Sequence, residues 1–73
     1  MVTIKNVDMG SFNLSCEAIG IDWYKETFLH DDTIDVVLAD NAKLVASFGT
    51  ITVMCDGLET SFDELDFHEV IIT

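Results

Sequence analysis

The sequence predicts a mainly β fold: a small antiparallel meander, closed into a barrel or stacked as a compact sandwich, with at most one or two short helical turns. Two observations support this class. Short runs rich in β-branched and aromatic residues alternate with polar residues, and turn formers such as Asp-Gly separate the runs. Its 73 residues predict one domain, residues 1–73. The alternative is an α+β fold in which residues 21–30, residues 61–67 or both are helical.

The first part of the chain predicts three strands. Residues 2–7 alternate apolar and polar side chains, as a half-buried strand does. Residues 8–11 are turn formers. Residues 12–18 alternate again and predict a second strand, which a bend at Gly20 follows. Residues 21–29 fit either a strand or a helical segment, and their β-branched and aromatic content favours a strand.

The middle of the chain predicts three further strands. After a polar loop at 30–33, residues 34–39 are almost continuously apolar, which fits a central strand. The turn formers 40–41 separate this strand from a return strand at 43–48. A bend then leads into residues 50–55. This run is rich in β-branched residues, which favours a strand.

The strongest local signal is a hairpin between residues 50–55 and 58–62. Its centre is Asp56-Gly57, and an Asp-Gly pair tolerates the positive φ angles of a two-residue type I′ turn. One face is predicted to be apolar and the other mostly polar. The predicted pairs are Ile51 with Phe62, Val53 with Thr60 and Cys55 with Leu58 on the apolar face, and Thr52 with Ser61 and Met54 with Glu59 on the other.

The last residues carry two competing patterns. Ser61 and Glu64 have the spacing of a capping box, which predicts one helical turn over residues 63–67 with Ser61 as its N-cap. Residues 67–73 then predict a closing strand.

The charge balance is the most unusual property of the composition. Fourteen acidic residues face three lysines and no arginine, which gives a formal net charge of −11. Direct binding to nucleic acid requires a footprint of Lys and Arg, and an anionic membrane surface repels such a chain. No apolar run approaches the ~20 residues of a membrane span, and the first residues lack the pattern of a signal peptide. We therefore expect a soluble, cytoplasmic protein that binds neither nucleic acid nor membrane directly.

No motif predicts catalysis, a metal or a cofactor. Cys16 and Cys55 both fall on apolar faces of predicted strands, which is typical of inert reduced thiols. His30 and His68 lie near acids but lack the ligand spacings of zinc or calcium sites. The chain also lacks a phosphate-binding glycine loop and a nucleophile elbow. We expect a protein that is not an enzyme.

The acids themselves are the candidate binding residues, because carboxylates within a Debye length of one another, about 8 Å, suit a groove lined by Lys and Arg. They fall into two groups. The first lies in the last eighteen residues and comprises Asp56, Glu59, Asp63, Glu64, Asp66 and Glu69; the second comprises Asp31, Asp32 and Asp35.

In being short, free of arginine, compact and very acidic, the chain resembles the small inhibitors that bacteriophages and mobile elements deploy against nucleic-acid-handling host enzymes, including anti-CRISPR and DNA-mimic proteins. The resemblance is one of composition and assigns no residue a role. It implies a non-enzymatic protein that blocks the basic nucleic-acid-binding surface of a partner protein or complex in the host cytoplasm. The alternative, from the apolar surplus, is a structural homo-oligomer such as a homodimer, a virion component or a scaffold component.

Overall fold

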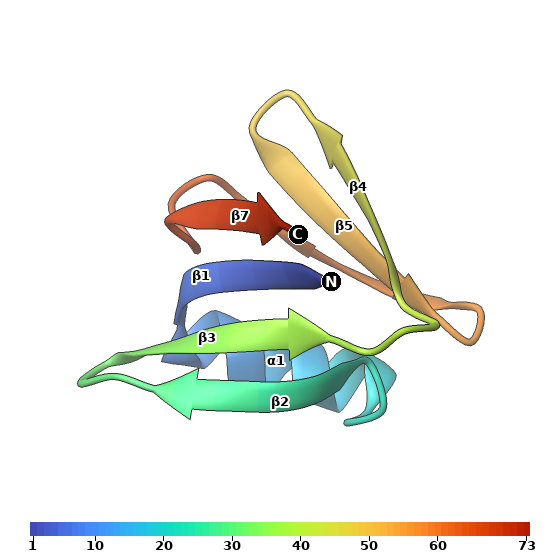
Figure 1. Cartoon of the computed structure of the whole chain (residues 1–73), viewed down its shortest axis with the longest axis horizontal. Coiled ribbons are helices and arrows are strands. Elements are labelled where there is room, and N and C mark those ends of the chain that lie inside the picture. The colour runs from blue at the N-terminus through green and yellow to red at the C-terminus, as the bar shows by residue number, and fades with distance from the viewer.

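The computed structural model describes residues 1–73 as seven strands and one helix (Figure 1). In chain order these are β1 (Val2–Asp8), α1 (Met9–Ile19), β2 (Tyr24–Leu29), β3 (Thr33–Leu38), β4 (Lys43–Ser47), β5 (Thr50–Cys55), β6 (Leu58–Phe62) and β7 (Glu69–Ile72). The strands form two antiparallel sheets: sheet A, in the order β2-β3-β1-β7, and sheet B, in the order β4-β5-β6. The predicted mainly β class is confirmed.

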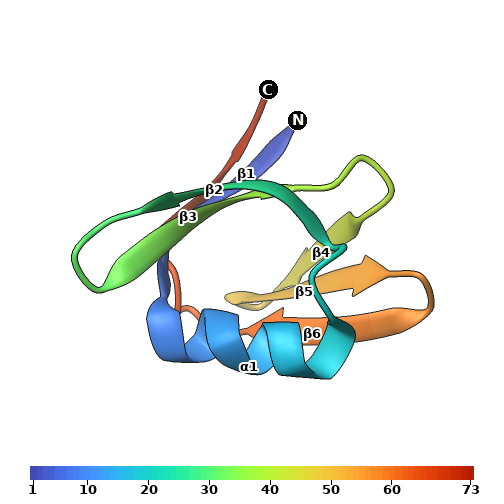
Figure 2. The same ribbon diagram turned by 90° about the horizontal axis from the view of Figure 1, so that it is seen from below.

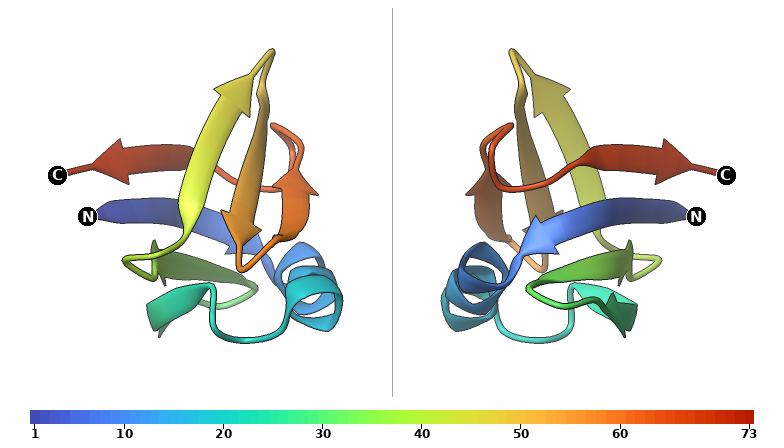
Figure 3. Two further views of the ribbon diagram at one scale, coloured as in Figure 1. Left: turned by 90° about the vertical axis from the view of Figure 1, so that its right-hand side faces the viewer. Right: turned by 90° about the vertical axis from the view of Figure 1, so that its left-hand side faces the viewer.

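The connectivity is a simple meander only in sheet B. In sheet A the first strand, β1, lies between β3 and β7, so the chain leaves this sheet after β3, builds sheet B and returns as β7. This return brings the two termini together, as Figure 3 shows. The N-terminal ammonium of Met1 donates a hydrogen bond to the carbonyl of Thr73 at 2.6 Å. The ends of the chain therefore close the β1–β7 ladder.

The core lies between two layers (Figure 2). Sheet A forms one layer, and α1 together with sheet B forms the other, with α1 packed beside β6. Both layers and the segment joining α1 to β2 contribute to the core. Its twelve buried members are Ile4, Val7, Phe12, Ile19, Trp23, Ile34, Val36, Leu38, Ile51, Val53, Cys55 and Phe62.

The β5–β6 hairpin has the predicted register, pair for pair. Asp56 and Gly57 both have positive φ angles, 53° and 81°, as a type I′ turn requires. The predicted apolar face is buried except at Thr60, which is half-buried, and at Leu58, which is 52% exposed. Leu58 was expected to join the core, but it lies beside the turn, beyond the reach of the opposite layer.

The segment predicted as a strand at 12–18 is helix α1, so this prediction is wrong. Asp8 caps the helix by accepting the backbone N–H of Ser11 at 3.1 Å, and Gly20 donates its N–H to the Cys16 carbonyl at 2.9 Å. The residues interpreted as a turn and a bend are thus the two caps of a helix. A helical apolar stripe coexists with the alternating pattern, and packing on β6 selects it; the stripe comprises Met9, Phe12, Cys16 and Ile19.

Neither predicted helical alternative is present. Residues 24–29 form strand β2, as favoured, and residues 63–67 form a turn rather than a helix. Ser61 does not cap anything: it belongs to β6, and its hydroxyl bonds to that of Thr52 across the sheet at 3.1 Å. Because Ser61 pairs with β5, it cannot act as an N-cap, and the predicted helical turn does not form.

Candidate functional site

Most of the negative charge lies on the surface without a neutralising partner. Of the fourteen acidic residues only Asp35 is buried and Asp66 half-buried, which leaves twelve exposed. Two of the three lysines are already paired: Lys5 with Asp35 at 2.7 Å and Lys25 with Asp40 at 2.8 Å. Lys43 is the one lysine outside an ion pair. The exposed surface is therefore strongly anionic.

The fold divides the C-terminal acids instead of gathering them on one surface. Asp56 precedes β6 and Asp63 follows it, so the two lie at opposite ends of a five-residue strand. At about 3.3 Å per residue they are roughly 17 Å or more apart, beyond the Debye length of about 8 Å. Glu59 lies near the Asp56 end, and Glu69 pairs with Lys5 in the β1–β7 ladder. Only Asp63, Glu64 and Asp66 stay together.

Asp66 lies beside an acid from the first half of the chain, Asp8. Asp8 pairs with Thr33, the residue after Asp32, and its backbone N–H donates to the Asp66 carbonyl at 2.8 Å. Figure 1 shows the same arrangement, with the β2–β3 turn, the end of β1 and the start of β7 at one end of the molecule. We call this surface the acidic end; it comprises Asp8, Asp31, Asp32, Asp63, Glu64 and Asp66.

No cation neutralises the acidic end, because none of its six carboxylates takes part in an ion pair. The opposite end differs. It holds the Lys25–Asp40 pair, and Lys43 lies in one cross-strand row with Met54 and Glu59. The six carboxylates of the acidic end are thus outside any ion pair, whereas lysines lie among the acids of the opposite end.

Hydrogen bonds fix the loop that carries three of these acids. The Asp66 N–H donates to the Asp63 carbonyl at 2.9 Å, and the Asp63 N–H donates to the Asp66 carboxylate at 3.0 Å. Asp66 is consequently a structural residue of the turn. The carboxylates of Asp63 and Glu64 take part in no hydrogen bond within the chain, and they are free to accept hydrogen bonds from a partner.

Asp8 is a member of the site that the sequence interpretation missed. It was assigned to a turn, although its spacing to Ser11 is that of an N-cap followed by a helix. That spacing was the available signal. Once the helix is recognised, Asp8 is the last residue of β1. It then lies next to the start of β3, which directly follows Asp31 and Asp32.

Asp35 was expected to belong to the acidic surface, and this is wrong. Its side chain is only 5% exposed. Strand β1 has a bulge between Ile4 and Val7, where Asn6 adopts a left-handed φ of 55°. The bulge turns the Asn6 N–H out of the ladder, and the Asp35 carboxylate accepts it at 2.9 Å. Asp35 is therefore the residue that holds the bulge.

Two further groups surround the same carboxylate. Lys5 donates to it at 2.7 Å, and Nε2 of His30 lies 3.0 Å away. Burial alone raises the pKa of Asp35, but the hydrogen bonds from Lys5, the Asn6 N–H and His30 outweigh it and lower that pKa from 3.8 to about 2. The folded protein consequently favours the charged form.

This shift predicts an acid-dependent loss of stability. Because the pKa of Asp35 is lower in the folded state, its contribution is complete above about pH 4 and disappears as the pH falls towards 2. The shift corresponds to about 2 kcal/mol. We expect Asp35→Asn to lower the free energy of unfolding by about that amount at neutral pH, with the difference shrinking between pH 4 and pH 2. Urea unfolding of both proteins across this range measures it, and a difference independent of pH would contradict the account.

Burial affects the reactivity of one of the two cysteines, Cys55. Burial, reinforced by the negative charge of Asp56, raises the pKa of the Cys55 thiol, which disfavours the thiolate that a nucleophile requires. Both cysteines are free thiols. No three His, Cys, Asp or Glu side chains of the chain are grouped so as to hold a metal ion. The single helix, of eleven residues, is too short to cross a membrane.

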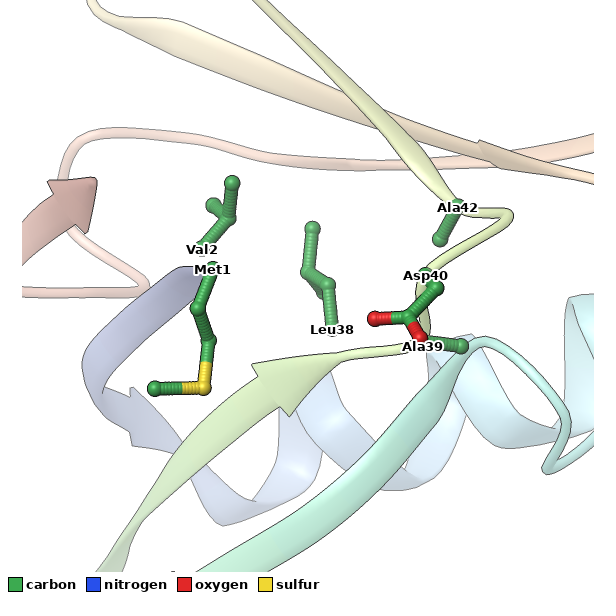
Figure 4. A pocket seen from close by; sticks show the side chains of 6 residues that line it. All are labelled: Met1, Val2, Leu38, Ala39, Asp40 and Ala42. Atoms are coloured by element: carbon green, nitrogen blue, oxygen red, sulfur yellow. The ribbon is translucent and has the colours of Figure 1, made fainter. Parts of the chain in front are cut away.

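One apolar cavity opens where β1, the end of β3 and the segment before β4 diverge (Figure 4). Its volume is about 150 Å³, below the roughly 300 Å³ at which small-molecule sites begin. Its only charged side chain, Asp40, is engaged by Lys25, whose hydrogen bond lowers the pKa of this carboxyl. The cavity is lined by Met1, Val2, Leu38, Ala39, Asp40 and Ala42.

A larger groove, of about 290 Å³, borders the acidic end. It lies between the β4–β5 turn and the loop after β6 and is lined by Phe48, Gly49, Thr50, Asp63, Glu64 and Leu65; we call it the Phe48 groove. Two of its apolar residues are almost fully in solvent, Phe48 at 105% and Leu65 at 92% exposure. An apolar rim and two free carboxylates thus occur together.

Comparisons of this chain with protein-family models, with curated proteins and with solved structures find no match.

Proposed function

We propose that this protein is a non-enzymatic binding module whose acidic end docks onto the basic, nucleic-acid-binding surface of a partner protein or complex and blocks it. The observation that supports this function is that six carboxylates outside any ion pair, from three separate segments, lie toward one end of the fold, with Asp8 linked to both of the other segments. A basic groove is the complementary surface.

The charge density supports competition with a short stretch of nucleic acid. Duplex DNA carries one negative charge per about 1.7 Å of axis, so six carboxylates match roughly 10 Å of duplex. The longest dimension of the molecule is 31 Å, so the acidic end substitutes for a short stretch of backbone while the rest of the domain supplies bulk. Blocking is then both electrostatic and steric.

Capture from the native host lysate at low salt, followed by elution with a salt gradient, tests this function. We expect a nucleic-acid-binding protein or complex to elute as the salt rises, because electrostatic docking weakens with ionic strength. Capture of proteins without a basic nucleic-acid-binding surface, or capture that is insensitive to salt, would contradict the proposal.

The alternative function is a structural homo-oligomer, and one observation favours it. Sheet A ends in two unpaired edge strands, β2 and β7, which carry the exposed side chains of Leu29 and Ile72. Free edges of this kind can pair with a second copy. Against this, each copy carries a net charge of −11 and repels the other.

Sedimentation at low and at high salt separates the two functions. We expect a monomer in both conditions, because the net charge of −11 on each copy opposes association. A stable oligomer that persists at high salt, where the repulsion is screened, would favour the structural function instead.

A further inference from the structure

We propose that the Phe48 groove binds an arginine side chain of the partner protein. This inference rests on the proposed function in one respect: it takes the partner to be a protein with a basic surface. It adds the point of contact and the residue type that the contact recognises.

Phe48 has a backbone conformation that is unusual for its residue type. Ser47 pairs with Thr50, so Phe48 and Gly49 form a two-residue turn, and their φ angles are 51° and 81°. Asn, Asp or Gly normally occupy the first position of such a turn, because a bulky residue is strained at positive φ. The ring of Phe48 contributes nothing to folding that offsets this strain, since the residue is 105% exposed. A strained aromatic residue that the fold does not use indicates a role outside the fold.

Two carboxylates line the same groove as Phe48. The side chain of Glu64 lies against the turn: a Cβ atom added to Gly49 would be 3.1 Å from its Oε2. Asp63, the neighbouring residue, lines the same groove. Neither carboxylate takes part in an ion pair or a hydrogen bond within the chain. Two free acceptors thus share one groove with an exposed aromatic residue and the exposed Leu65.

Arginine is the side chain that satisfies all of these groups at once. Its planar guanidinium forms two parallel hydrogen bonds with a carboxylate and stacks on an aromatic face, and its aliphatic stem packs on an apolar residue such as Leu65. Lysine offers a compact, strongly hydrated charge and stacks less well. The volume of about 290 Å³ is large enough for one such side chain.

The other occupants fit less well. A second copy of this chain has no arginine, and Lys43 is its one lysine without an ion pair. A nucleic acid would place phosphates against Asp63 and Glu64. The negative charge of the groove therefore favours a cationic side chain of a protein as its ligand.

Titration of the labelled protein with N-acetyl-arginine methylamide, followed by amide NMR shifts, tests the inference. The comparison probes are the lysine and norleucine analogues. We expect saturating shifts confined to residues 48–50 and 63–65, with affinity for the arginine probe about threefold or more above that for the lysine probe. Shifts spread evenly over all exposed acids, or equal affinity for the arginine and lysine probes, would overturn it.

Phe48→Asn is the decisive variant, because asparagine suits the turn while the ring is lost. We expect its melting temperature to rise and its affinity for the arginine probe to fall by about fivefold or more. Leu58→Ser is the matched control, since Leu58 is also exposed but lies at the other end of β6. It should bind the probe as the wild type does. Unchanged binding by Phe48→Asn would refute the role of the ring.

The two proposals can fail separately in the lysate capture. Suppose that the Phe48→Asn variant captures the partner as well as the wild type does, and that charge reversal at the acidic end abolishes capture. The groove inference is then wrong, and the proposed function stands. Capture that survives charge reversal removes the proposed function, whatever the arginine titration shows.

Discussion

Reversing three charges of the acidic end, by Asp32→Lys, Asp63→Lys and Glu64→Lys, is expected to weaken partner binding about tenfold or more. An exposed ion pair contributes about 0.2–1 kcal/mol, and reversal replaces each attraction by a repulsion. Three reversals together therefore exceed the roughly 1.4 kcal/mol that a tenfold change in affinity requires. Calorimetric titration of the captured partner measures the change.

The matched control reverses three exposed acids elsewhere, by Glu17→Lys, Asp22→Lys and Glu59→Lys. Both triple variants change the net charge of −11 by the same amount, so they differ only in where the charge lies. We expect the control to lose affinity by about threefold or less, through weaker long-range steering. Equal losses in the two variants would show that total charge, and not the acidic end, drives binding.

Replacing Trp23 by alanine is expected to remove about 3–5 kcal/mol of stability. Trp23 is fully buried and lies 5.7 Å from the ring of Phe12 in α1 and 6.1 Å from that of Phe62 in β6. It thereby joins the helix to sheet B. A domain of this length has a total stability of roughly 4–11 kcal/mol, so the variant should be largely unfolded or close to it.

The Trp23→Phe variant separates the contribution of ring packing to stability from the cost of the buried indole N–H. The indole Nε1 is buried and has no hydrogen-bond partner, which costs about 1–3 kcal/mol in the wild type. Phenylalanine keeps a ring and removes this donor, so we expect a much smaller loss than with alanine. Denaturant unfolding followed by far-ultraviolet circular dichroism suits both variants, since it does not depend on the lost tryptophan. Equal stability of the alanine variant and the wild type would contradict the core assignment.

Local chemistry made part of this fold predictable. The Asp56-Gly57 pair specifies both the turn and the register of β5–β6, because the required φ angles are a property of those two residues. Helix α1 was missed for the opposite reason: residues 12–18 satisfy two periods, and contact with a distant strand, β6, selects between them. Local sequence carries no information on that contact.

The candidate site was predictable only in its composition. The acids of the last eighteen residues were identified, but their division between the two ends of β6 depends on the path of the chain. Asp35 looked like its neighbours in sequence, and only the bulge in β1 shows that its charge is used inside the fold. The Phe48 groove joins a turn to a loop fourteen or more residues later, and no local pattern predicts it.

Displacement of nucleic acid from the captured partner shows whether this protein blocks the nucleic-acid-binding surface of that partner. Fluorescence anisotropy of a labelled duplex bound to that partner is followed as this protein is added. We expect the anisotropy to fall to that of the free duplex, at protein concentrations that rise with salt, while the acidic-end triple variant displaces about tenfold less efficiently. A ternary complex, in which this protein binds the partner and the duplex stays bound, would contradict the account.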